Sequence, residues 1–157
     1  MKLFKVLFLI LVINIFSFAS SEYIDININK LTKQATKENK TVLLFFHMKY
    51  CPYCEKMIDE SFSNKDIQAQ LKKDFTVVDV NINDSETIMF NDFKGSKSQF
   101  SKKMDINFYP TILFLNSDNE ITYTLRGYRD KYIFSKSLDY IETRAYEDMS
   151  FPDYIGK

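Results

Sequence analysis

The two cysteines of this 157-residue chain stand in residues 49–57, "KYCPYCEKM", with two residues between them. Thiols at this spacing can form half of a metal site, a structural disulfide or a reactive pair. A disulfide closing so short a loop would contribute only about 2 kcal/mol on a chain-entropy estimate, so stabilisation explains the pair poorly. A structural zinc site needs four ligands, and the chain has no further cysteine and one histidine, His47. The residues therefore favour a reactive pair.

Pro52 predicts that a helix begins at the cysteine motif, because its fixed φ suits the first helical turn. At such a helix start the sulfur of Cys51 meets unpaired N–H groups and the positive end of the helix dipole, which favour thiolate over thiol. We therefore predict that Cys51 is the nucleophile. Cys54 lies one turn further in, close enough to form a disulfide with Cys51 and to resolve its mixed disulfides.

Apolar runs and helical periodicity predict the elements that position this pair. Strands joined through a helix should be parallel and a terminal hairpin antiparallel, which predicts an α/β fold with one central mixed sheet of four strands flanked by helices. The predicted strands cover 41–46, 75–82, 110–116 and 120–128, and the predicted helices cover 25–39 with Asp25 as cap, a stretch from the motif onward, 66–75, 96–104 and 129–146. Residues 83–95 are predicted to be a polar connection and the tail 150–157 to be loose.

The first 19 residues have the layout of a secretory signal peptide. Lysines 2 and 5 precede a 13-residue apolar run, and Ser17 and Ala19 stand at the −3 and −1 positions of a plausible cleavage site. The alternative is a membrane anchor, but the run is shorter than the roughly 20 residues that span a bilayer. We therefore predict export, with a signal peptide at 1–19 and one domain at 20–157.

Composition and charge limit the partners of that domain. The chain is 45% apolar and 16% aromatic, enough for one domain with a real core. Removing residues 1–19 leaves 19 basic and 21 acidic residues, a net charge of −2. This nearly balanced charge does not predict binding to nucleic acid or to anionic lipid.

The chain resembles the thioredoxin superfamily from about residue 25 to 146. The residues that carry the resemblance are "CPYC" after a buried strand, "YPT" at 109–111 opening a core strand, and Gly127 closing the hairpin. The resemblance implies a thioredoxin fold with an extra N-terminal helix. It also implies a cis bond before Pro110 beside the reactive pair, with backbone groups of Tyr109 offered to an extended substrate.

The signal sequence and first helix are similar to those of exported thioredoxin-like proteins linked to sulfur oxidation and cytochrome maturation, which implies a periplasmic location. Two positions depart from thioredoxins: Tyr50 replaces a tryptophan, and Phe45 replaces a buried aspartate. The proton acceptor for Cys54 is therefore open. Glu55 and Lys56 are candidates, or are helix residues that simply face solvent.

Aromatic side chains and one histidine complete the predicted site. The tyrosines either form an apolar collar that a substrate covers or serve only in packing, and His47 either tunes the thiolate or is satisfied by backbone. "CPYC" also occurs in glutaredoxins, but their glycine pair is absent here, which disfavours glutathione as a dedicated substrate. The predicted substrate-binding residues are Tyr50, Pro52, Tyr53, Tyr109 and Pro110.

The predicted function is an exported thiol–disulfide oxidoreductase of the protein-disulfide reductase type. It is expected to act as a monomer on cysteine-containing proteins, with no cofactor beyond the reversible Cys51–Cys54 disulfide. A reductase outside the cytoplasm would need a membrane thiol protein as electron donor. The alternatives are a dithiol oxidase that donates disulfides, a non-catalytic binding module of the same fold, and a carrier of metal or sulfur compounds.

Overall fold

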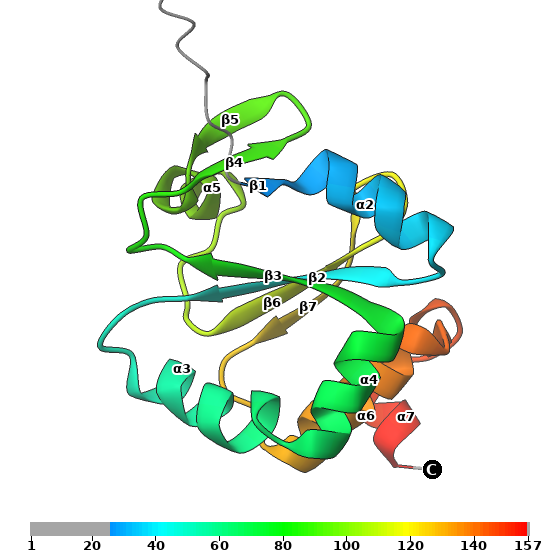
Figure 1. Ribbon diagram of the computed structural model, residues 1–157. Helices are drawn as coiled ribbons and strands as arrows, with labels where there is room; N and C mark the ends of the chain where they lie inside the picture. Colours follow the sequence, from blue (N-terminus) through cyan, green and yellow to red (C-terminus); the bar gives the residue numbers. More distant parts are fainter. Residues whose placement is uncertain (1–25, 157) are drawn as a thin grey trace, which may run out of the picture.

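A four-stranded mixed sheet forms the centre of the protein (Figure 1). The computed structural model describes residues 26–156, so the predicted signal peptide and the predicted cap Asp25 lie outside the described residues. The strand order is β3-β2-β6-β7, in which β2 pairs parallel with β3 and antiparallel with β6, and β6 pairs antiparallel with β7. The predicted α/β fold with a mixed sheet is confirmed. The strands are β2 (Thr41–His47), β3 (Phe75–Asn81), β6 (Thr111–Leu115) and β7 (Ile121–Arg126).

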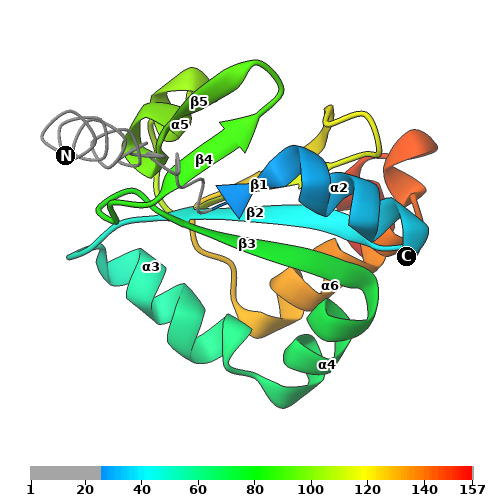
Figure 2. The same cartoon turned by 45° about the horizontal axis from the view of Figure 1, so that its top comes forward.

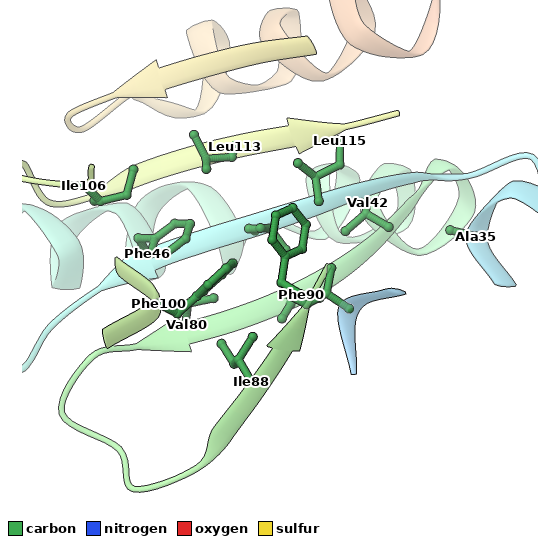
Figure 3. Close-up of a cluster of buried hydrophobic side chains, with 13 residues drawn as sticks. Ala35, Val42, Phe46, Val80, Ile88, Phe90, Phe100, Ile106, Leu113 and Leu115 are labelled. Carbon is green, nitrogen blue, oxygen red and sulfur yellow. The ribbon is translucent and has the colours of Figure 1, made fainter. Parts of the chain in front are cut away.

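Strand β2 separates two hydrophobic cores. Its residues 42–46 are all buried, as expected of a central strand that is covered on both faces. Because successive side chains of a strand point to opposite faces, Leu44 and Phe46 enter the first core, whereas Leu43 and Phe45 enter the second. Figure 3 shows the first core, in which Phe46 of β2 and Phe100 lie close together, with ring centroids 5.7 Å apart.

Helices cover both faces of the sheet, as predicted (Figure 2). The helices α2 and α5 lie on the face of the first core, and α3, α4 and α6 lie on the face of the second. The additional helix before the first core strand is α2, as the resemblance implied. The helices are α2 (Ile28–Lys37), α3 (Pro52–Met57), η2 (a π-helical turn, Ile58–Phe62), α4 (Lys65–Asp74), α5 (Lys97–Lys103) and α6 (Lys131–Glu142).

Side-chain caps fix where these helices begin. Helix α2 starts later than predicted, because the Asn27 side chain accepts a hydrogen bond from the N–H of Lys30 and residues 26 and 27 are extended. The predicted last helix also divides: α6 ends at Glu142, and Arg144 has a positive φ of 57° before the short 3-10 helix η3 (Ala145–Glu147). The other caps are Asn64 for α4, Ser96 for α5 and Asp130 for α6.

A second sheet of three strands takes two of them from the segment where we predicted only a polar connection, and the third from the start of the predicted helix 25–39. It has the order β1-β4-β5, formed by β1 (Ile26–Asn27), β4 (Thr87–Phe90) and β5 (Phe93–Ser96). The prediction failed because these strands are short and depend on distant partners. The Asn119 amide donates to side-chain oxygens of Asn29 and Asn91, so three separate segments of the chain hold this sheet in place.

The C-terminal tail is helical, so the prediction that it is loose is wrong. Helix α7 (Phe151–Ile155) begins at Ser150, whose side chain accepts from the N–H of Asp153. The ring of Phe151 lies 5.3 Å from that of Tyr140 in α6, and the Tyr140 hydroxyl donates to the carbonyl of Met149. Packing against α6 therefore orders a segment too short to be stable alone.

This packing gives a test of the C-terminal helix. Phe151→Ala should lower the free energy of unfolding by about 1–2 kcal/mol, because it removes a partly buried ring from the second core. Ile155→Ala, on the exposed side of the same helix, should cost less than half as much. Urea denaturation of both variants makes the comparison, and equal effects would show that α7 does not contribute through Phe151.

Candidate active site

The cysteine pair lies at the start of α3, as predicted. Cys51 and Cys54 are joined by a disulfide with their Cα atoms 5.2 Å apart. Cys51 is the N-cap: its sulfur accepts from the N–H of Cys54 at 3.2 Å, and its carbonyl accepts from the N–H of Glu55 at 3.0 Å. Cys51 is partly exposed, whereas Cys54 is only 1% exposed. Cys51 is therefore the more accessible residue of the pair.

The helix behind the pair is longer than α3 alone. The π-helical turn η2 follows directly and extends the helix to Phe62. The hydroxyl of Ser61 donates to the carbonyl of Arg129 at 2.7 Å, which ties η2 to the segment before α6. The aligned peptide dipoles of this helix place positive potential at its N-terminus, where the Cys51 sulfur accepts a hydrogen bond from the backbone.

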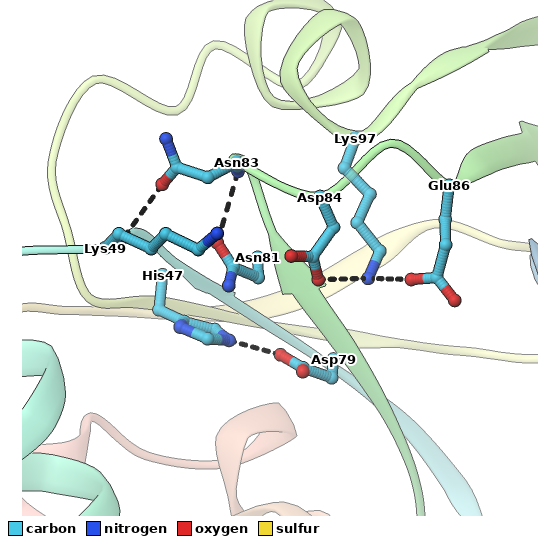
Figure 4. A network of polar contacts seen from close by, with 8 residues as sticks. All are labelled: His47, Lys49, Asp79, Asn81, Asn83, Asp84, Glu86 and Lys97. Carbon is cyan, nitrogen blue, oxygen red and sulfur yellow. Dashed lines mark hydrogen bonds and ion pairs between the residues drawn. The ribbon is translucent and has the colours of Figure 1, made fainter.

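The residues that follow β3 hold the loop between β2 and the cysteines (Figure 4). The Asn83 side chain accepts from the N–H of Lys49 at 2.8 Å, and the carbonyl of His47 accepts from the N–H of Ile82 at 3.0 Å. Tyr50, which follows Lys49, has a positive φ of 58°. This conformation is uncommon for an aromatic residue and needs the support of these hydrogen bonds. Asn83 is thus a positioning residue that the sequence analysis did not identify.

The segment before β6 lies at the same end of the sheet as the cysteine loop. Thr111 pairs with Phe46 near the end of β2, so Tyr109 and Pro110 extend beyond the strands on the side where the cysteine loop departs. The Tyr109–Pro110 peptide bond is cis. The carbonyl of Pro110 accepts from the N–H of Gly127 at 2.7 Å, and the φ of +84° at Gly127 suits a residue without a side chain.

Three aromatic side chains at this end of the sheet are exposed. Two of them adjoin the cysteines in the sequence, and the third lies in the segment before β6. Tyr50 is 93% exposed, Tyr53 is 63% exposed and Phe108 is 59% exposed. Tyr109, which we expected in the collar, is instead partly buried against the first core, and its hydroxyl bonds to that of Ser101 at 2.6 Å. We define the aromatic collar as Tyr50, Tyr53 and Phe108; the signal for Phe108 was its place directly before the "YPT" motif.

The side chain of His47 bonds to that of Asp79, so the hypothesis that backbone alone satisfies it is wrong. The Nε2 atom of His47 bonds to the Asp79 carboxylate, and the imidazole ring stacks on Phe45 with 4.8 Å between centroids. Burial raises the pKa of Asp79, but the hydrogen bond and charge of His47 outweigh it and hold this pKa below its usual value. Asp79 was visible in the sequence as the one charged residue in the apolar run 75–82.

The two candidates that the sequence offered for accepting the proton of Cys54 are exposed to solvent. Glu55 and Lys56 are both exposed, whereas Cys54 lies on the buried side of the same helix. The Lys56 ammonium lies 4.6 Å from the centroid of the Tyr128 ring and 4.0 Å from a carboxylate oxygen of Glu60. These side chains therefore form surface contacts at a distance from the buried thiol.

A buried lysine holds the loop that follows β3. The side chain of Lys97 is only 3% exposed, and its ammonium contacts the carboxylates of Asp84, at 3.3 Å, and Glu86. Burial lowers the pKa of Lys97, but its hydrogen bonds to Glu86 and Asp84 outweigh burial and raise this pKa above the usual value. Figure 4 shows this cluster beside the His47–Asp79 pair. Within residues 26–156, no cluster of histidine, cysteine and acidic side chains is arranged to hold a metal ion, and no helix could cross a bilayer.

Comparison with known proteins agrees with this geometry. The family described as a thioredoxin-like domain matches residues 28–142 of the chain. This chain belongs to the thioredoxin-like family. No curated protein matches it. The match includes the cysteine pair, the Tyr109–Pro110 bond and all four strands of the main sheet.

Solved structures show the same fold at low sequence identity. A thioredoxin-fold protein from Helicobacter pylori is 21% identical with a TM-score of 0.67, and the match covers 81% of this chain and 96% of that one. A thioredoxin from Thermus thermophilus is 22% identical with a TM-score of 0.55, covering 68% and 77%. The C-terminal domain of Neisseria meningitidis DsbD in its oxidised form is 18% identical with a TM-score of 0.50, covering 74% and 91%.

The Lys97 cluster gives a prediction about pH. Lys97→Met should lower the free energy of unfolding at pH 7 by about 2 kcal/mol, because it leaves two carboxylates without their cation. A raised pKa means that the stabilisation is complete below the unfolded pKa of about 10.4 and is lost as pH rises through the folded value. Denaturation at pH 7 and pH 11 should therefore show the difference between the variant and the native protein shrinking. The exposed Lys33→Met is the matched control, and an equal loss in both variants would contradict a role for burial.

Proposed function

We propose that this protein is an exported thiol–disulfide oxidoreductase that reduces disulfides in other proteins. The observation that supports it best is the unequal pair at the start of α3, with Cys51 accessible and Cys54 buried. The N-terminal position of Cys51 stabilises its thiolate through backbone N–H groups. The aromatic collar offers an apolar surface to a docking partner, which the isolated chain leaves exposed.

The proposed reaction balances as two thiol–disulfide exchanges. The Cys51 thiolate attacks one sulfur of a substrate disulfide, forming a mixed disulfide and releasing the other substrate sulfur as a thiolate. Cys54 then loses its proton and attacks the sulfur of Cys51, which releases the second substrate thiolate and forms the Cys51–Cys54 disulfide. The substrate gains two electrons, and its two thiolates take up two protons, one released by Cys54 and one from solvent, which received the proton that Cys51 lost on ionising. The protein ends in the disulfide form that the structure shows.

Two further partners belong to this proposal. The oxidised pair must be reduced again, and outside the cytoplasm the donor is proposed to be a membrane protein with a reactive dithiol. Export to the periplasm is proposed from the pattern of residues 1–19. The substrate is a cysteine-containing protein, and Tyr50, Pro52, Tyr53, Pro110 and the backbone of Tyr109 are proposed to contact the segment that flanks its disulfide.

The roles of the two cysteines are tested by separate substitutions. Cys51→Ser should abolish the reduction of insulin disulfides, because no nucleophile is left at the exposed position. Cys54→Ser should retain the first attack and accumulate covalent complexes, since the resolving sulfur is absent. Turnover is followed by insulin precipitation, and the complexes are followed by non-reducing electrophoresis. Undiminished activity of Cys51→Ser would contradict the proposal, because the reduction of insulin would then not pass through Cys51.

The direction of the reaction is tested by the reduction potential. Potentials of related dithiol pairs run from about −270 to −120 mV, a span of about 7 kcal/mol. We expect about −250 mV or lower, because the described residues include no large inserted helical domain of the kind that oxidases carry. Titration in defined dithiol–disulfide buffers gives the value. A potential near −120 mV would instead make the protein a donor of disulfides.

A further inference from the structure

We propose that His47, oriented by Asp79, accepts the proton of the Cys54 thiol when Cys54 attacks the mixed disulfide. This inference rests on the proposed function and concerns its second step. Cys54 is almost fully buried, and burial in apolar surroundings disfavours the thiolate that must form. The step therefore needs a base on the buried side of α3.

The fold puts His47 on that side. Residues 43, 45 and 47 of β2 share one face of the sheet, and Leu43 and Phe45 lie in the second core together with Met57 of α3. Met57 and Cys54 stand three residues apart on the same buried face of that helix. The face of β2 that carries His47 is therefore the face that α3 covers.

The contacts between β2 and the helix α3–η2 show where His47 lies along that helix. Strand β2 runs toward the cysteine loop, and the helix α3–η2 then runs back beneath the sheet (Figure 1). The far end of this helix meets β2 where Phe62 contacts Phe45, with ring centroids 4.6 Å apart. His47 stacks on Phe45 at the next position toward the loop. It therefore lies between the Phe45–Phe62 contact and the cysteine end of the helix.

The hydrogen bond to Asp79 also selects the ring nitrogen that can act as the base. An ionised carboxylate only accepts hydrogen bonds, so the Nε2 atom that bonds to Asp79 carries the hydrogen. The neutral ring then keeps its lone pair on Nδ1, for which no hydrogen bond is found within residues 26–156. Figure 4 shows the two ring nitrogens on opposite sides, with one turned toward Asp79 and the other away from it.

Asp79 acts here as a positioning residue. Its carboxylate fixes the ring orientation and stabilises the imidazolium that forms when the proton arrives. It lies in register with Phe45 on the neighbouring strand and lines a shallow cleft of about 300 Å³ with Asp84, Glu86 and Lys97. Lys97 also favours the ionised form of Asp79 through its charge. Other charged groups on the surrounding elements are Lys49, Glu55, Lys56, Asp59, Glu60 and Arg129.

The proton balance of the step is complete. The Cys54 thiol gives its proton to Nδ1 of neutral His47, and the thiolate attacks the sulfur of Cys51. The bond between Cys51 and the substrate sulfur breaks, and the substrate leaves as a thiolate. The imidazolium then gives the proton to that thiolate or to solvent, which returns His47 to its neutral form.

The reaction of the reduced protein with 5,5′-dithiobis(2-nitrobenzoate) separates the two steps. Attack by Cys51 releases one equivalent of coloured thiolate, and attack by Cys54 on the resulting mixed disulfide releases a second. His47→Gln should slow the second phase by about 10²-fold at pH 7 and leave the first phase within a factor of a few. Asp79→Asn should move the pH midpoint of the second phase to lower pH, because the imidazolium loses its counter-ion. Asp59→Asn, which removes an exposed carboxylate on η2, is the matched control and should change neither phase.

Each outcome has a distinct meaning. An unchanged rate and pH midpoint of the second phase in both His47→Gln and Asp79→Asn would overturn the role of the pair. Equal slowing of both phases would also overturn it, because the pair would then act on the site as a whole and not on Cys54. If the native protein releases only one equivalent, thiol–disulfide exchange itself fails, and the proposed function falls before His47 is tested.

Discussion

The site depends on one constraint, the burial of β2 on both faces. A strand covered on both sides has a fixed position and register, because a slip by one residue would exchange the side chains of its two cores. The residues that follow its end are positioned by that register. His47 closes the strand, the cysteine loop leaves from it, and Pro110 and Asn81 lie at the ends of the paired strands on either side. The packing of β2 in the two cores thus holds the reactive pair in place.

The same burial creates the chemical problem of the site. Covering Cys54 protects it from solvent and from partners, but it also makes its thiolate costly to form. The thiolate of Cys51 is easier to form, because its sulfur lies at a helix start and the residue is partly exposed. The two cysteines therefore differ in environment although they are three residues apart. In the proposed reaction, this difference sets which sulfur attacks first and explains why only the second step needs a base.

The sequence was sufficient for the parts of the fold that local patterns control. Continuous apolar runs identified β2 and β3, and Pro52 after Cys51 identified the start of α3. The elements it missed depend on contacts between distant segments. The second sheet is held by asparagine side chains at positions 29, 91 and 119, and α7 is held by Tyr140 of the preceding helix. The pairing of His47 with Asp79 could not be seen, because parallel strand register brings together residues 32 positions apart.

The aromatic collar connects docking to chemistry in the proposed reaction. Tyr50, Tyr53 and Phe108 expose apolar surface that a bound partner would cover, which removes water from the surroundings of the disulfide. Charge interactions strengthen as water leaves, so the attraction between the Cys51 thiolate and the helix N-terminus grows when a substrate is bound. The partly buried Tyr109 takes no part in this, since its hydroxyl is bonded to that of Ser101. Substrate binding would then favour the Cys51 thiolate most where a disulfide is present to react with it, so the exposed collar would serve the first step and the buried thiol of Cys54 the second.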